Sequence, residues 1–158
     1  MSKTVEFASL TVRATNGMEL TDYLDGIIVP AFFQAESYHH QKSRNSYSLS
    51  HTNLFDAFMD GVHLYFISGR FVKNETISRE KRLVGGKLVN SNGAFDLATT
   101  SIFVLCLNNH RLILAQETDR NPKLEEFSKF ISRSIRVKWY EYQDRIYKLT
   151  LRGGKTDF

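Results

Sequence analysis

The stretch from Ser101 to Leu107 constrains the fold more than any other part of the chain, because almost every residue in it is apolar. A run of this length and composition is typical of a strand buried on both faces of a sheet. Asn108-Asn109 then predicts a tight turn, since Asn tolerates a positive φ. Leu112 to Glu117 is expected to return as the partner strand. A buried hairpin therefore anchors the predicted sheet.

Other segments of the chain show the pattern of strands. Val5 to Ala14 alternates apolar and more polar residues, which predicts a half-buried strand. Val62 to Lys73 is rich in β-branched and aromatic residues, with Gly69 as a probable site of a β-bulge. Ala35 to Asn53 is polar and is expected to be irregular, apart from a short strand around Tyr47 to Ser50.

The stretch after Lys73 is basic and contains a pair of glycines. We expect Asn74-Glu75 to turn the chain back into the segment from Thr76 to Asn90, which Gly85-Gly86 interrupts. The cations near these glycines are Arg79, Lys81, Arg82 and Lys87.

Two segments predict helices. The first has apolar residues at three- and four-residue steps, which is typical of an amphipathic helix; they are Leu20, Leu24, Ile27, Ile28 and Phe32. Pro30 lies inside this pattern and should break or kink the helix near Val29. For the second, Asn121-Pro122 predicts an N-cap and first helical position. Its apolar face is expected to consist of Leu124, Phe127, Phe130 and Ile131.

The C-terminal region predicts a further hairpin. Val137 to Tyr142 and Ile146 to Leu151 have the pattern of two strands joined around Gln143-Asp144. The alternation would place Trp139 toward the core and would leave Tyr140 and Tyr142, beside Lys138, on an exposed face.

These elements predict a single α+β domain over residues 1–158, with a mostly antiparallel sheet and two main helices packed on it. The chain is long enough to bury a hydrophobic core, and its 12 Phe and 7 Tyr argue against disorder. The sequence continues through Gly153-Gly154 to Phe158 without a further element, which fits either a frayed tail or a fragment, such as the N-terminal domain, of a longer protein.

Composition excludes several kinds of protein. The single cysteine, Cys106, excludes an internal disulfide and any zinc site that needs several thiolates. The N-terminal residues lack the apolar core of a signal peptide, and no run approaches the length of a membrane span. We therefore expect a soluble, cytoplasmic protein. Gly154-Lys155-Thr156 lacks the first glycine and the following helix of a phosphate-binding loop, so we expect no nucleotide site. We predict neither a cofactor nor a metal.

Charge is concentrated near the C-terminus. Residues 133–155 contain seven cations and two anions, a local excess of +5 in a chain whose net charge is +4. Cations interleaved with aromatic rings favour nucleic acids, because the cations pair with phosphates and the rings stack on unpaired bases. We therefore predict a non-catalytic nucleic-acid-binding domain, for DNA or RNA. The predicted binding residues are Arg136, Lys138, Tyr140, Tyr142, Arg145, Lys148 and Arg152, with Arg79, Lys81 and Arg82 as a second patch across a groove.

Three alternatives stay open. The basic hairpin can be a solvated surface without a ligand. The domain can be a protein-protein interaction or oligomerisation module, with Tyr140, Tyr142 and Tyr147 meeting the partner. It can also be a small metal-independent nuclease that depends on His39 and His40, since imidazole titrates near neutral pH.

The order of elements from Ser101 onward resembles that of bacterial phage-exclusion proteins of the RexA type. There too an apolar strand, a short turn, a return strand and an amphipathic helix follow one another, and the similarity extends over the stretch that leads into the helix at Pro122. The resemblance implies a DNA-associated component of phage defence. It carries over no site residues, because the match lies in the pattern.

Overall fold

The computed structural model describes residues 3–11 and 23–153; within these, the side chains of residues 78–80, 82, 91–92 and 146–153 are outside the described part. Residues 12–14 of the predicted first strand also lie outside it. The elements in chain order are β1 (Thr4–Ser9), a π-helical turn η2 (Leu24–Ile28), α1 (Val29–Phe33), β2 (Tyr38–His39), β3 (Asn45–Met59), β4 (Val62–Val84), β5 (Lys87–Cys106), β6 (Arg111–Gln116) and α2 (Leu124–Gly153).

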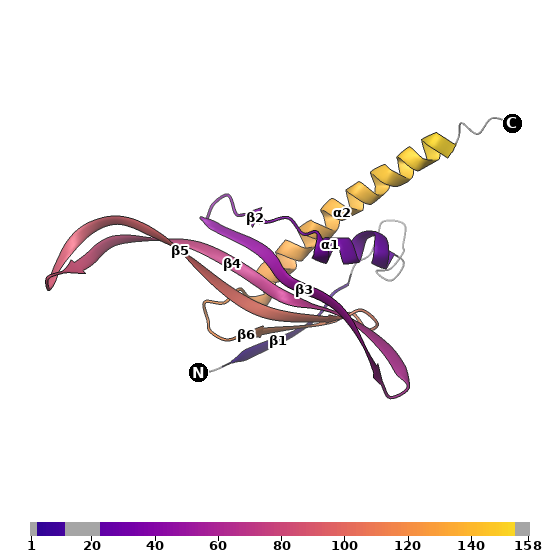
Figure 1. Ribbon diagram of the computed structural model, residues 1–158, viewed down its shortest axis with the longest axis horizontal. Helices are drawn as coiled ribbons and strands as arrows, with labels where there is room; N and C mark the ends of the chain where they lie inside the picture. Colours follow the sequence, from indigo (N-terminus) through magenta and orange to yellow (C-terminus); the bar gives the residue numbers. More distant parts are fainter. Residues whose placement is uncertain (1–2, 12–22, 154–158) are drawn as a thin grey trace.

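The strands form one six-stranded antiparallel sheet in the order β1-β6-β5-β4-β3-β2. Figure 1 shows the helices on one side of it. The predicted α+β class is therefore confirmed. The predicted hairpin of β5 and β6 is confirmed as well, with residues 107–109 forming the turn between them.

The core lies between the sheet and the helices. The side chains of Phe71 and Phe103, from the two middle strands, are fully buried, and each ring centroid lies within 5.3 Å of that of Phe127 in α2. Phe32 of α1 joins them at 5.7 Å from Phe103. The opposite face of the sheet has no helix over it in the described structure, and Phe7, Ile102 and Ile113 are exposed there.

Gly69 leaves room for the ring of Phe103 to pack closely against the backbone of β4. It lies opposite Phe103 in the β4–β5 register. On its other side, His51 and Thr52 of β3 both fall opposite it, so the bulge predicted at Gly69 lies instead on the partner strand β3, directly across from Gly69. His51 takes a positive φ of 53° to form the bulge. A side chain at residue 69 would have to fit between an aromatic ring and a neighbouring strand.

The segment after Lys73 differs from the prediction. The expected turn at Asn74-Glu75 is wrong, because β4 continues without a break to Val84. The turn is formed by Gly85-Gly86, whose φ angles of +57° and +76° match a type I′ hairpin. A type I′ turn needs a positive φ at both central residues, which Glu75 disfavours, so the chain turns where two glycines permit it.

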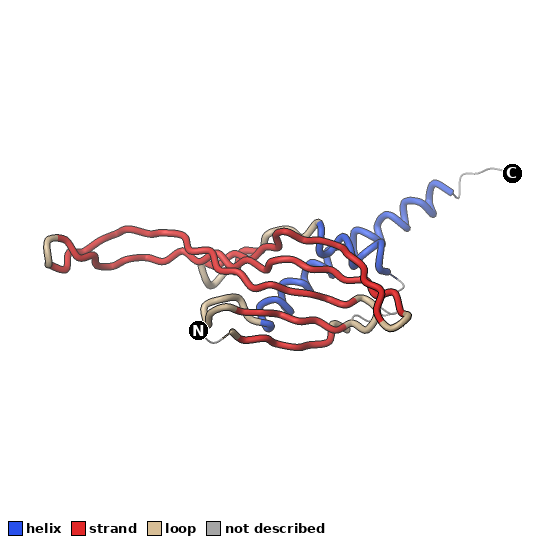
Figure 2. The backbone as a smooth tube through the Cα atoms, turned by 60° about the horizontal axis from the view of Figure 1, so that its bottom comes forward, coloured by secondary structure: helices blue, strands red, loops and turns tan. Residues whose placement is uncertain are grey.

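This extension creates the feature that we call the arm, residues 76–96. β3 pairs with β4 only as far as Glu75, so from Thr76 onward β4 and β5 have only each other as strand partners among the described residues. Figures 1 and 2 show the arm projecting well beyond the body of the sheet.

The predicted C-terminal hairpin is wrong, because α2 runs through it as one helix of 30 residues. The residues predicted as alternating strands also have helical spacing, since Ile135, Trp139 and Tyr142 lie four and three positions apart. These three residues pack against the core, with Trp139 and Tyr142 both contacting Tyr23. Burial of this stripe favours the helix over the strand preference of its aromatic residues.

The proline in the first helix does not break it. Pro30 occupies the first turn of α1, where its missing N–H costs little. The helix does change at Val29, from π-helical to α-helical geometry. None of the helices in the described residues is long and apolar enough to cross a membrane.

We expect Gly69→Ala to destabilise the fold. A Cβ at residue 69 would lie 2.9 Å from the buried Phe103 ring and 3.2 Å from the Ser50 carbonyl oxygen. Overpacking of this kind lowers the free energy of unfolding by about 1–3 kcal/mol. Chemical denaturation measures it, with Ser68→Ala on the open face of the same strand as the control. An unchanged midpoint for Gly69→Ala would contradict the close approach.

Candidate nucleic-acid interface

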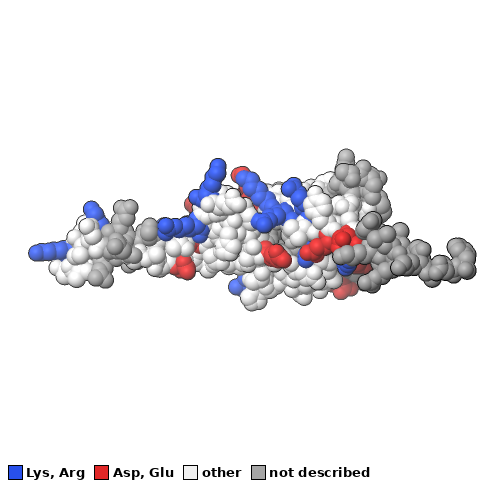
Figure 3. All heavy atoms as spheres, turned by 90° about the horizontal axis from the view of Figure 1, so that it is seen from above, with Lys and Arg blue, Asp and Glu red and all other residues white. Residues whose placement is uncertain are grey.

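The tip of the arm is basic. Residues 79–87 contain four cations, Arg79, Lys81, Arg82 and Lys87, and one anion, Glu80. Lys81 and Lys87 are exposed, while the side chains of Arg79 and Arg82 lie outside the described part. Figure 3 shows Lys and Arg side chains at the end of the molecule that the arm occupies. Three of the predicted binding residues therefore lie on the arm.

The same tip also carries exposed apolar side chains. Leu83 and Leu88 are opposite each other in the register and are 70% and 72% exposed. Val84 is 48% exposed. Leucine side chains that stay in water do not stabilise a hairpin. The tip thus combines charge with exposed apolar surface that a ligand can cover.

The hairpin at the opposite end of β4 has the reverse charge. We call it the acidic hairpin, residues 53–66; it contains Asp56 and Asp60 and no Lys or Arg. Its tip is also apolar, with Phe58 74% exposed. His63 pairs with Asp56 and stacks on Tyr65 at 4.9 Å. The molecule therefore has a basic apolar end and an acidic apolar end, which Figure 1 shows on opposite sides.

The predicted residues on α2 are only partly accessible. Arg136 and Tyr140 lie one turn apart on the outer surface, with Tyr140 64% exposed as predicted. Lys138 is wrongly predicted as exposed: it is 8% exposed and its Nζ lies 3.0 Å from Glu141 Oε2. An ion-paired and buried lysine is a poor phosphate ligand.

Tyr142 is also wrongly predicted as exposed. Its ring is half-buried against Gly26, where a Cβ would lie 2.8 Å from it. Arg145 is exposed, and its Nη2 lies 3.5 Å from the Gly26 carbonyl oxygen. The backbone of Lys148 and Arg152 is helical, but their side chains are outside the described part.

The two predicted patches do not form one groove. The arm and the C-terminal half of α2 extend toward opposite ends of the molecule in both ribbon views. Arg136 and Tyr140 therefore belong to a surface separate from that of Lys81 and Lys87. Arg136 and Tyr140 lie on the same side of α2 because they are one helical turn apart, and not because they share a hairpin.

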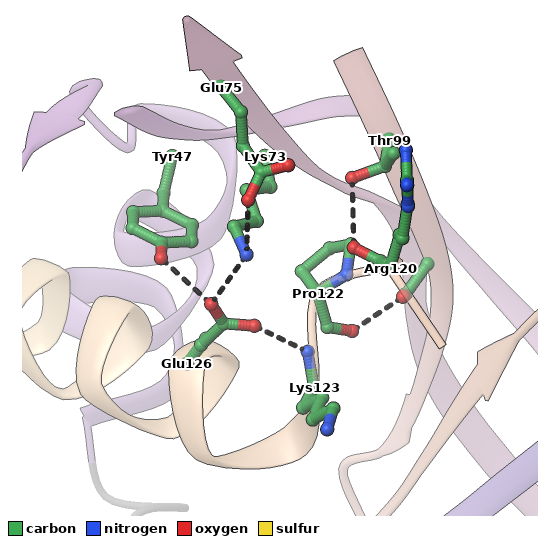
Figure 4. Close-up of polar contacts among 9 residues, drawn as sticks. Tyr47, Lys73, Glu75, Thr99, Arg120, Pro122, Lys123 and Glu126 are labelled. Atoms are coloured by element: carbon green, nitrogen blue, oxygen red, sulfur yellow. Dashed lines mark hydrogen bonds and ion pairs between the residues drawn. The ribbon is translucent and has the colours of Figure 1, made fainter. Parts of the chain in front are cut away.

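The N-terminus of α2 holds the densest group of charged contacts (Figure 4). Glu126 accepts a hydrogen bond from the Tyr47 hydroxyl at 2.8 Å and lies 3.2 Å from the Lys73 Nζ. Its other oxygen accepts the Lys123 N–H at 2.8 Å. Lys73 also pairs with Glu75 at 2.8 Å.

Glu126, Lys73 and Tyr47 have shifted pKa values. Burial alone would raise the pKa of Glu126, but the donors Lys123 N–H and Tyr47 and the charge of Lys73 hold it below its ordinary value. Burial would lower the pKa of Lys73, yet Glu75 and Glu126 raise it. Burial and the hydrogen bond to Glu126 raise the pKa of Tyr47. The charged forms of Glu126 and Lys73 therefore stabilise each other in the folded state.

This cluster is a structural cap rather than an anion site. Glu126 acts as the N3 residue of a capping box, because it reaches back to the backbone N–H of Lys123. Glu6 of β1 accepts the next N–H, that of Leu124, at 2.9 Å. The adjacent groove, of about 620 Å³, is lined by four cations and four anions: Lys73, Arg120, Lys123, Lys129, Glu75, Asp119, Glu125 and Glu126.

The predicted N-cap at Asn121 is wrong. The helix begins at Leu124. The Asn121 side chain instead donates to the Thr100 carbonyl at 2.7 Å and accepts from Thr118. Pro122 is buried beside β5, where its carbonyl accepts a hydrogen bond from Ser101. Asn121-Pro122 therefore ties the loop to the sheet before the helix starts.

His40, one of the two histidines of the nuclease alternative, has a structural contact. His40 Nδ1 accepts the backbone N–H groups of Lys42 and Ser43 at 3.3 and 3.2 Å, so its ring closes a loop. His39 is the last residue of β2 and is exposed. The described residues contain no group of three or more His, Cys, Asp or Glu side chains that could hold a metal.

We expect Glu126→Gln to lower the free energy of unfolding at neutral pH by about 1 kcal/mol, because it weakens the cap and the pair with Lys73. Since the folded pKa is lowered, the stabilisation is complete above the ordinary value of 4.5 and is lost as pH falls through the folded pKa. Denaturation from neutral to acidic pH should show the variant converging on the wild type. Glu125→Gln, at the exposed neighbouring position, is the control; equal effects of the two variants would contradict the cap.

No protein-family model matches this chain, and neither curated proteins nor solved structures show a significant match to it.

Proposed function

We propose that this protein binds nucleic acid through the basic tip of the arm. The observation that carries the proposal is a two-stranded ribbon that leaves the body of the sheet and ends in exposed Lys81 and Lys87. Each phosphate that such a cation neutralises releases condensed counterions, which drives binding. We therefore place the proposed binding surface on the arm and not on the C-terminal segment that was predicted as a hairpin. The arm also contains Arg79 and Arg82.

The shape of the arm supports this proposal. A two-stranded ribbon is narrow enough to enter the major groove of duplex DNA, and basic ribbons also serve minor-groove binders. The arm exposes both of its faces, because all of its described side chains from Lys81 to Asp96 are exposed. Arg136 and Tyr140 of α2 supply a second, separate cationic and aromatic surface for a longer ligand.

A role in phage defence belongs to the same proposal. The resemblance to RexA-type phage-exclusion proteins rests on the order of strand, turn, strand and helix, which β5, β6 and α2 follow. A DNA-binding component of such a system would use the arm to hold its target.

We expect Lys81→Glu with Lys87→Glu to abolish most of the binding. The full chain should bind DNA or RNA with an affinity that falls steeply with salt, and losing two phosphate contacts should lower the slope of log K against log salt by about 2. Fluorescence anisotropy with single- and double-stranded DNA and RNA measures this.

The matched control for a single reversal is Arg111→Glu. Arg111 is exposed at the start of β6, beside the end of β5 that lies farthest from the arm. It should leave the affinity unchanged, whereas Lys87→Glu lowers it. Binding that is insensitive to salt, or equally sensitive to both substitutions, would refute the proposed interface.

The charge asymmetry favours self-association as a second candidate. The acidic hairpin of one copy complements the basic arm of another, and both tips expose apolar side chains. Such contacts form rings or filaments when copies join head to tail, and a two-fold dimer when two copies lie antiparallel and make both contacts at once.

Self-association predicts that the mass in solution rises with protein concentration. Lys81→Glu with Lys87→Glu should give a monomer, because both ends then carry negative charge. Adding Asp56→Lys with Asp60→Lys should restore the association by exchanging the charges. Sedimentation at low salt measures all three proteins; a wild type that stays monomeric at high concentration would exclude this candidate.

A further inference from the structure

We propose that the leucine pair at the tip of the arm is a wedge that enters the minor groove of double-stranded DNA and bends it. This inference rests on the proposed function and adds its ligand and mode of binding. It starts from Leu83 and Leu88, which are directly opposite each other and among the most exposed apolar residues described.

The register places both leucines on one face of the ribbon. Side chains alternate along a strand, so Lys81 lies on the same face as Leu83, while Val84 and Lys87 lie on the other. The apolar pair is therefore accompanied by a cation on its own face and by another across the ribbon. Cations on both faces of the ribbon suit a wedge that lies between two phosphate backbones.

The turn keeps the tip slim. Gly85 and Gly86 carry no side chains, and no atoms lie within 4 Å of where their Cβ atoms would be. Leu83 and Leu88 are thus only one residue pair behind the end of the arm, which is formed by Val84 and Lys87. Apolar side chains at such a position can insert between base pairs when the tip lies in the minor groove.

Minor-groove binding by apolar wedges has a defined mechanism. Leu, Ile, Met, Phe or Pro side chains partly unstack a base step and kink the duplex toward the major groove, and the bend brings more of the DNA against the protein. Steps such as TA unstack most readily. From Thr76 to Val84 the arm extends for about 26 Å, so the body of the protein stays clear of the kinked step.

Duplex DNA fits this tip better than RNA does. The minor groove of an RNA duplex is wide and shallow, so an inserted apolar wedge makes few contacts with its walls. A single strand would be bound by flat rings on which bases stack, and the described tip has none, since Leu83, Val84 and Leu88 are aliphatic.

The experiment uses the full chain and a duplex with a central TA step and a fluorophore at each end. Energy transfer reports the bend, and anisotropy reports the affinity. We expect the wild type to shorten the end-to-end distance, and Leu83→Ser with Leu88→Ser to abolish the shortening while lowering the affinity by about tenfold or less. The salt slope should stay as in the wild type, because Lys81 and Lys87 are retained.

Two further variants separate the wedge from general damage. Leu83→Met with Leu88→Met keeps apolar side chains and should keep the bend. Phe58→Ser with Met59→Ser removes a comparably exposed apolar pair, 74% and 55% exposed, from the acidic hairpin and should bend DNA like the wild type.

The outcomes distinguish the two proposals. A wild type that binds no nucleic acid refutes the proposed function and the wedge together. Salt-dependent binding without bending, preference for a single strand or for RNA, or an unchanged bend in Leu83→Ser with Leu88→Ser refutes the wedge alone. If the serine variant instead turns an oligomer into a monomer and leaves DNA bending intact, the leucines contact protein, and the wedge is likewise refuted.

Discussion

The contact of Phe127 with Phe71 and Phe103 holds the described structure together. It joins α2 to the two longest strands, and it is possible because Gly69 leaves room for the Phe103 ring between neighbouring strands. The capping group around Glu126 lies directly beside it, one residue before Phe127, so the start of the helix and the centre of the core are positioned together. The register of β4 with β5 places Gly69 opposite Phe103 and so permits this contact.

That register has a consequence for the rest of the molecule. Once Phe71 and Phe103 are in place, β4 and β5 are too long for the core, and their remaining residues leave the sheet as the arm. An isolated two-stranded ribbon is only marginally stable in water. The arm therefore depends on pairing that begins in the sheet and on the two glycines that close it, and the surface it offers is available to a ligand.

The elements that could be predicted were those with a strong local signal. The apolar run of β5, the turn after it and the return strand β6 all lie where expected, although His110, and neither Asn, takes the positive φ there. The C-terminal stretch shows the limit of the same reasoning. Val137, Trp139 and Tyr142 fit a strand by composition, and nothing local reveals that Tyr23 and Gly26 provide a surface on which a helical stripe can pack. The basic residues near Gly85-Gly86 were identified correctly, but their place at the end of an arm was not.

By itself the sequence determined the α+β class, the central hairpin and the existence of two helices, since periodicity and glycine or asparagine turns act over a few residues. The tertiary structure decided how far each element extends. Whether Lys138 is exposed or buried against its own helix and α1 depends on partners distant in the chain. The free energy of packing between such partners exceeds the local conformational preference. For this reason the C-terminal stretch that was predicted as a basic hairpin is a helix, and the basic hairpin of the structure is the arm.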